Sequence, residues 1–128
     1  MHTITHLSMS LAIRKLVEKH LPIKLDKVGF MLGNIKPDFA PRLVKIPHYR
    51  DDAIHFVKSE IKALLNYQII EHTKCTRYFS QRLGVILHYL SDFFCYAHSK
   101  NFKGNMFNHY LYEIGLSNYF KANFKKNF

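Results

Sequence analysis

The sequence predicts an all-α protein: a single domain formed by a bundle of several helices. Apolar residues recur at intervals of three and four along most of the 128-residue chain, and strand-like alternation is almost absent. Apolar residues make up 48% of the sequence and aromatic residues 15%, which excludes a disordered or low-complexity chain. A chain of this length corresponds to one domain, so we expect residues 1–128 to fold as one unit.

The first half of the chain predicts two helices followed by a long irregular segment. Apolar residues at helical spacing indicate a helix over residues 5–19, and Pro22 prevents its continuation. A second, short helix is predicted over residues 27–32, where Gly33 would end it in a left-handed conformation. Residues 33–50 contain several prolines, and we predict no regular element there.

The second half of the chain predicts three helices. One covers residues 51–69, with two aspartates at its start as N-cap and early-turn charges. The longest pattern covers residues 76–98 and is apolar almost all round, which is typical of a central, buried helix; Gly84 is its one weak point. A last helix is predicted over residues 106–124, with an apolar face and a basic end.

The chain is strongly basic, with 19 Lys and Arg against 9 Asp and Glu and a formal net charge of +10. Such a surface attracts phosphate groups, nucleic acid or anionic lipid. Lys36, Arg42 and Lys45 lie in the irregular segment on either side of Asp38, where they either attract anionic substrates or serve as ordinary surface charges. No apolar run is long enough to cross a bilayer, and no secretion signal is recognisable. We therefore expect a cytoplasmic protein whose membrane contact is at most peripheral, on an anionic surface.

The sequence contains nine histidines, as many as its Asp and Glu residues together, and this high histidine content needs an explanation. On a helix, residues four apart share a face, so a histidine and a carboxylate at that spacing can bind one metal ion. The sequence contains three such pairs in which the histidine comes first: His48 and Asp52, His88 and Asp92, and His109 and Glu113. The first pair lies partly outside the helix patterns, and surface and N-cap chemistry explains it better than metal binding does.

Asp92 is the most informative of these residues, because it lies in the middle of an apolar helix pattern. A buried carboxylate is costly unless it is paired or bound to metal. His98 lies at the end of the same predicted helix, and His109 and Glu113 lie on the next, so an antiparallel pair of helices could bring all of them together. A single histidine is more often a surface or core residue, but the combined spacing favours a metal site.

Five short segments of the sequence follow one another in a recognisable order: TH in THLSMSLAI, PD in LGNIKPDF, HF in DDAIHF, then HYLSDFFCYAH and HYLYE. In this order they resemble the zinc-dependent phospholipase C family, whose all-helical fold is similar to that of secreted single-strand nucleases. The resemblance spans most of the chain. It implies one zinc ion held by Asp38, His55, His88 and Asp92, a second held by His98, His109 and Glu113, and Asp92 bridging to a third near His6.

Two positions of this implied site stay open. His48 competes with His55 in the same region, and the phenylalanine that follows His55 favours His55. The secreted members of the family use an N-terminal tryptophan as a ligand of the third zinc, but this sequence has no Trp. His2 is an alternative ligand, so the resemblance implies two or three zinc ions.

The resemblance also implies the reaction: hydrolysis of a phosphodiester, in a phospholipid or its headgroup ester, by a metal-activated hydroxide that attacks phosphorus. Asp38 is the candidate to orient or deprotonate the attacking water, because a ligand carboxylate has a second oxygen that can accept a proton.

Three alternatives compete with this interpretation. A zinc nuclease would use the same metals on single-stranded nucleic acid, with aromatic side chains stacking on bases. A non-catalytic helical binding protein would use zinc only to stabilise its fold. A basic nucleic-acid-binding domain without metal would fit the charge but leave Asp92 and the many histidines unexplained.

Overall fold

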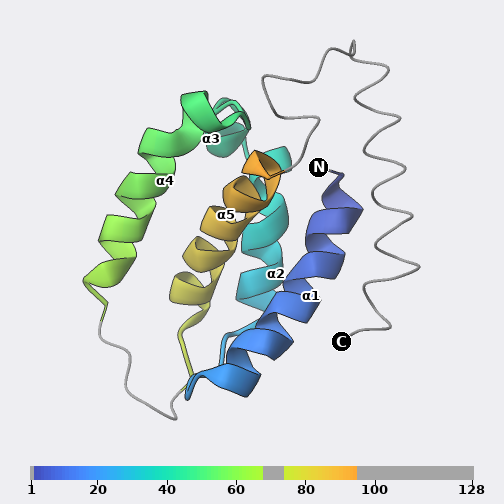
Figure 1. The fold of residues 1–128 in the computed structure, drawn as a ribbon, viewed down its shortest axis with the longest axis vertical. Helices are drawn as coiled ribbons and strands as arrows, with labels where there is room; N and C mark the ends of the chain where they lie inside the picture. Colours follow the sequence, from blue (N-terminus) through green and yellow to red (C-terminus); the bar gives the residue numbers. More distant parts are fainter. Residues whose placement is uncertain (1, 68–73, 95–128) are drawn as a thin grey trace.

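The chain folds as a bundle of helices (Figure 1). The computed structural model describes residues 2–67 and 74–94, and these residues contain no strand beyond one isolated bridge. The all-α prediction is therefore confirmed. The described elements are α1 (Thr3–His20), α2 (Lys27–Ile35), the 3-10 helix η1 (Lys36–Asp38), α3 (Pro41–Val44), α4 (Arg50–Leu65) and α5 (Arg77–Phe93).

Side chains just before three of the helices accept hydrogen bonds from free amides of the first turn. Asp26 caps α2 through an amide three residues later, at 2.7 Å. Thr76 caps α5 in the same way, at 3.1 Å. His2 accepts from an amide of α1 through a longer contact of 3.3 Å. These contacts determine where α1, α2 and α5 begin.

The segment that was predicted to be irregular is partly helical. α2 continues past Gly33 to Ile35, so Gly33 lies inside the helix and is not a left-handed cap. Pro37 and Pro41 lie in the first turns of η1 and α3, where an amide hydrogen would have no helical partner. Proline therefore starts these two short elements instead of preventing them.

The later helices begin close to their predicted positions. α4 starts at Arg50 with Tyr49 as its N-cap, so the two aspartates lie in its first turn and not at the cap itself. It ends at Leu65, earlier than predicted. The last turn predicted for the helix of residues 76–98, and the whole predicted helix of residues 106–124, lie outside the described residues.

Helix α5 lies between α4 and α2, and α1 packs against α2 (Figure 1). Residues from three helices form the centre of the core: Phe30 of α2, Val57 of α4 and Tyr89 of α5 are all almost completely buried. α5 therefore buries surface on both of its sides, as its sequence pattern predicts. Among the described helices, none combines the length and the hydropathy that a membrane span requires.

Two glycines allow α2 and α5 to approach until their backbones touch. A Cβ atom at Gly84 would lie 2.5 Å from the Phe30 carbonyl oxygen and 2.9 Å from the Asn34 amide nitrogen. A Cβ atom at Gly33 would overlap the carbonyl oxygen of Gln81 on α5. Gly84, which the sequence marks as a weak point of its helix, is thus a point of backbone contact between the two helices.

Gly84→Ala is expected to destabilise the fold by about 2 kcal/mol, because the added methyl group overpacks the contact between α2 and α5. In an open helix the same change would stabilise by up to about 1 kcal/mol. Urea denaturation followed by circular dichroism measures the difference. Ser59→Ala, at an exposed position of α4, is the control and should change stability by less than about 0.5 kcal/mol. Unchanged or increased stability of Gly84→Ala would contradict the close contact.

Candidate metal centre

Five histidine and aspartate side chains from separate parts of the chain form overlapping groups of candidate metal ligands. The start of α1 and the end of α5, which carry three of them, lie at the same end of the bundle (Figure 1). α1 and η1 each contribute one of them, the segment between α3 and α4 contributes another, and α5 contributes two that lie one turn apart. We call these residues the His/Asp cluster. Its members are His6, Asp38, His48, His88 and Asp92.

The Asp92 carboxylate is completely buried and is surrounded by three imidazoles. Its Oδ1 lies 3.1 Å from Nε2 of His6, and its Oδ2 lies 2.8 Å from Nδ1 of His48 and 3.3 Å from Nε2 of His88. Burial alone would raise the pKa of Asp92, but its hydrogen bonds with His48 and His6 outweigh this effect and hold the pKa well below its ordinary value. The charged carboxylate is therefore the stable form in this interior.

Asp38 faces the same histidines from η1. Its Oδ1 lies 3.5 Å from Nε2 of His88 and 3.9 Å from Nδ1 of His48. Its other oxygen, Oδ2, accepts a hydrogen bond from the Thr3 hydroxyl at 2.6 Å. The buried Pro37 immediately before it holds the start of η1 in place. Asp38 thus points one oxygen at His48 and His88, and a hydroxyl from α1 orients its carboxylate.

The ring of His88 is oriented by a backbone carbonyl. Its Nδ1 lies 2.6 Å from the Asn34 oxygen, and since a carbonyl can only accept, Nδ1 carries the donated hydrogen. Asn34 is in the last turn of α2, where carbonyl groups lack partners within the helix. In a neutral imidazole, Nε2 then carries a lone pair, and this lone pair faces oxygens of Asp38 and Asp92. A cation between these atoms would turn their mutual repulsion into attraction.

His6 carries a buried nitrogen that has no hydrogen-bond partner in the described part of the chain. Its ring stacks on His88 with centroids 3.7 Å apart, and its Nδ1 has no hydrogen-bond partner among the described residues. Burial lowers the pKa of His6 and outweighs the hydrogen bond to Asp92. An unsatisfied buried polar atom costs about 1–3 kcal/mol. A second hydrogen-bonding group or a metal ion would remove that cost.

Tyr89 packs behind the cluster as a fixed wall. Its ring meets those of His48 and His88 edge-on, with centroids 5.1 Å and 5.6 Å away. Burial and the neighbouring carboxylates raise the pKa of Tyr89 to about 12, so the hydroxyl keeps its proton. That hydroxyl donates to the Leu43 carbonyl at 3.1 Å.

The cluster fits a zinc ion by its chemistry. Zinc prefers imidazole nitrogen and carboxylate oxygen, besides thiolate, in compact groups of three or four ligands. Metal ligands in proteins are commonly oriented by hydrogen bonds to groups that do not themselves touch the metal. The contacts of Asn34 with His88 and of Thr3 with Asp38 are hydrogen bonds of this type. In two overlapping groups, one ligand atom from each residue lies within 4.8 Å of the others: His6, Asp38 and His88, and His48, His88 and Asp92.

The sequence matches the family model of zinc dependent phospholipase C over residues 5–128. The chain belongs to this family. No significant match was found among curated proteins or among solved structures. The family and the residues of the His/Asp cluster thus both indicate a zinc site.

The cluster contains four of the residues that the sequence predicted as metal ligands: His6, Asp38, His88 and Asp92. His2 caps α1 and belongs to neither group of candidate ligands. The second implied zinc site falls outside the described residues, so its ligands stay predictions: His98, His109 and Glu113.

The cluster contains His48, whereas the sequence analysis favoured His55. His55 is exposed on α4 and belongs to neither candidate group. The phenylalanine that favoured it, Phe56, packs on Tyr89 with ring centroids 5.4 Å apart, so it marks the core face of α4 and not a ligand. His48 instead reaches Asp92 from the segment before α4. The geometry therefore replaces His55 by His48 as the candidate ligand.

Two supporting residues were missed by the sequence analysis. Thr3 lies one turn before His6 on α1, and a hydroxyl at that spacing is only a weak signal. Asn34 acts through its backbone carbonyl, so its residue type gives no signal at all. Both contacts become visible only when α1, α2, η1 and α5 are packed together.

His48→Ala should weaken zinc binding by at least about tenfold, because the cluster loses an imidazole that contacts Asp92. His55→Ala is the matched control and should leave zinc affinity within about twofold, the spread expected for a change that removes no interaction. Competition against a chromophoric chelator measures both affinities. A larger loss for His55→Ala than for His48→Ala would restore the original assignment and contradict the geometry.

Proposed function

We propose that the protein is a zinc-dependent phosphodiester hydrolase of the phospholipase C type. Its substrate would be a phospholipid or a water-soluble ester of a phospholipid headgroup. The observation that carries the proposal is the buried Asp92 carboxylate among three histidines, with Asp38 opposite, in a chain of this family. A purely structural core has no need of such a costly group.

The residues that would hold zinc in the described part of the chain are the five members of the His/Asp cluster. When bound, zinc would neutralise charge on the phosphate oxygens and make a water molecule more acidic. Asp92 has no solvent-exposed surface, so it would hold the metal and not contact the substrate. His88 would bind through Nε2, because Nδ1 is committed to the Asn34 carbonyl.

Asp38 is the candidate catalytic residue, as proton acceptor for the attacking water. Its side chain is 22% exposed, in contrast to the fully buried Asp92 and His88, so a water molecule can reach it. The Thr3 hydroxyl occupies Oδ2 and fixes the carboxylate plane. Oδ1 then remains on the side of the histidines. As the water oxygen forms its bond to phosphorus, its proton passes to Asp38 and the bond between phosphorus and the alcohol oxygen breaks. Asp38 then passes that proton to the leaving oxygen, which departs as the alcohol.

Asp38→Asn should lower turnover by about 100-fold or more, because the amide cannot accept the proton. Zinc content should fall much less, since the other members of the cluster remain. Initial rates and elemental analysis of the same preparation give both values. Thr3→Ser keeps the orienting hydroxyl and should retain most of the activity, whereas Thr3→Val should lose part of it. Turnover of Asp38→Asn equal to that of the unchanged protein would reject the proposed role.

Zinc-loaded protein should hydrolyse a chromogenic phosphorylcholine ester and leave single-stranded DNA intact under the same conditions. A chelator should abolish hydrolysis and added zinc should restore it, because histidine and carboxylate ligands bind the metal reversibly. Cleavage of DNA without hydrolysis of the ester would reassign the protein to the nucleases. Zinc-loaded, folded protein that cleaves neither substrate would contradict the hydrolase proposal and favour a metal that only stabilises the fold.

A further inference from the structure

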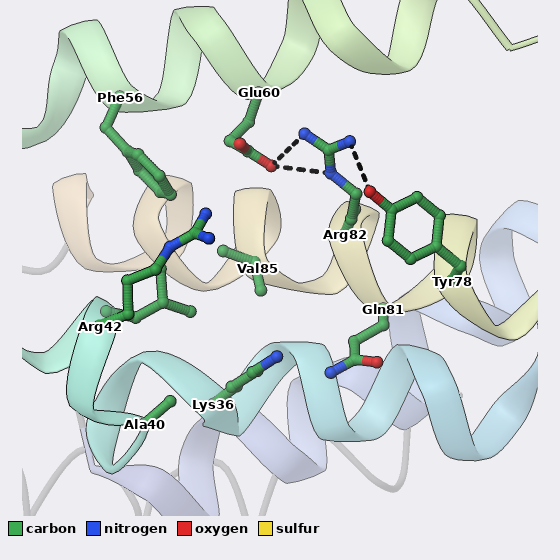
Figure 2. Close-up of a pocket in the computed structure, with 10 residues that line it drawn as sticks. Lys36, Ala40, Arg42, Phe56, Glu60, Tyr78, Gln81, Arg82 and Val85 are labelled. Atoms are coloured by element: carbon green, nitrogen blue, oxygen red, sulfur yellow. Dashed lines mark hydrogen bonds and ion pairs between the residues drawn. The ribbon is translucent and has the colours of Figure 1, made fainter.

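A pocket that is separate from the His/Asp cluster lies between α4, α5 and the segment formed by η1 and α3 (Figure 2). Its volume is about 310 Å³, at the small end of the range for sites that bind small molecules. None of the residues that line it belongs to the cluster.

The pocket contains more positive than negative charge. Arg82 is neutralised by Glu60, with Nε and Nη2 each 3.0 Å from the same carboxylate oxygen, and its Nη1 donates to the Tyr78 hydroxyl at 3.1 Å. Lys36 and Arg42 form no ion pair within the described part of the chain, and Figure 2 shows both side chains extending along the pocket. Two cationic groups are therefore available to a ligand.

The remaining wall is largely apolar. Leu43 and Val85 are buried, and the half-buried Phe56 presents an aromatic ring. An apolar wall lowers the local dielectric constant and strengthens the attraction between a cation and an anion. It also favours a ligand that carries a small apolar or aromatic group beside its charge.

We propose that this pocket binds the phosphate group of a phosphomonoester. Two cations without an ion-pair partner among the described residues match a group that carries up to two negative charges, whereas a carboxylate would offset only one of them. The guanidinium of Arg42 suits two oxygens of a phosphate, and the ammonium of Lys36 adds a point charge. The phosphate source is either a soluble ester or the headgroup of a lipid.

The pocket is a neighbour of the metal centre but is divided from it by Tyr89. Phe56 of the pocket lies 5.4 Å from the Tyr89 ring, and His48 of the cluster lies 5.1 Å from that ring. Helix α5 contributes residues to both sites. Val85 of the pocket precedes His88 of the cluster by three residues, which is a rise of about 4.5 Å along the helix. Binding in the pocket is measured without turnover, so it can fail or succeed independently of the proposed hydrolase activity.

Isothermal titration of the zinc-loaded full chain with phenylphosphonate, a non-hydrolysable analogue of a phosphomonoester, tests the proposal. Benzoate, which has the same ring and only one charge, should bind more weakly. Arg42→Glu should weaken phenylphosphonate binding by about tenfold or more, because that is the loss in affinity expected when one charge-assisted hydrogen bond is removed. Lys45→Glu changes the net charge equally at an exposed position outside the pocket, and should change affinity by less than about threefold because solvent screens it.

Two further variants keep the test independent of the stability of Arg42→Glu. Lys36→Met should also weaken binding, and thermal unfolding of each variant checks that it is folded. Glu60→Gln should strengthen binding about threefold, because it releases Arg82 to the ligand. No binding of phenylphosphonate at millimolar concentration, or equal losses in Arg42→Glu and Lys45→Glu, would overturn the proposal.

Vesicles of phosphatidylcholine, with and without phosphatidic acid, identify the source of the phosphate. Sedimentation that depends on both phosphatidic acid and Arg42 supports the pocket as a site for a lipid headgroup. Phenylphosphonate binding that depends on Arg42, without such sedimentation, supports the pocket as a site for a soluble phosphomonoester. Sedimentation that Arg42→Glu and Lys45→Glu reduce equally would count against the pocket as the lipid site.

Discussion

The backbone contact between α2 and α5 is the constraint on which the described structure depends. Gly33 and Gly84 bring the two helices together at a distance that no side chain would permit. The carbonyl of Asn34, adjacent to Gly33, then meets the ring of His88, one turn after Gly84. A packing feature of the core thus sets the orientation of a candidate metal ligand, so fold stability and site geometry are coupled.

Around that contact, the cluster draws on segments that are distant in the sequence. The carboxylate of Asp92 makes contacts with histidines 86 and 44 residues away. Such a group costs free energy when it is buried alone, and it stabilises the fold only when its partners arrive. Metal binding would then contribute directly to folding, because the unfolded chain holds no preformed site. Tyr89 separates this centre from a cationic pocket that also draws on η1 and α5.

Much of this arrangement could be predicted from the sequence. Helical periodicity revealed the all-α class and the central position of α5, and the spacing of His88 and Asp92 indicated a metal site. The sequence favoured His55, whereas the structure groups His48 with the candidate ligands, because the order of residues does not say which face of α4 meets α5. The role of Gly33 as a contact, and that of the Asn34 carbonyl, could not be predicted because both depend on how helices pack rather than on residue type.

The central claim is that histidines and carboxylates of this chain hold zinc in the interior. Elemental analysis and X-ray absorption at the zinc edge, on protein purified without added metal or affinity histidines, test it most directly. We expect at least one zinc per chain, with imidazole nitrogen and carboxylate oxygen as ligands. Folded protein that contains no zinc and binds none when it is supplied, or zinc bound through sulfur, would contradict it.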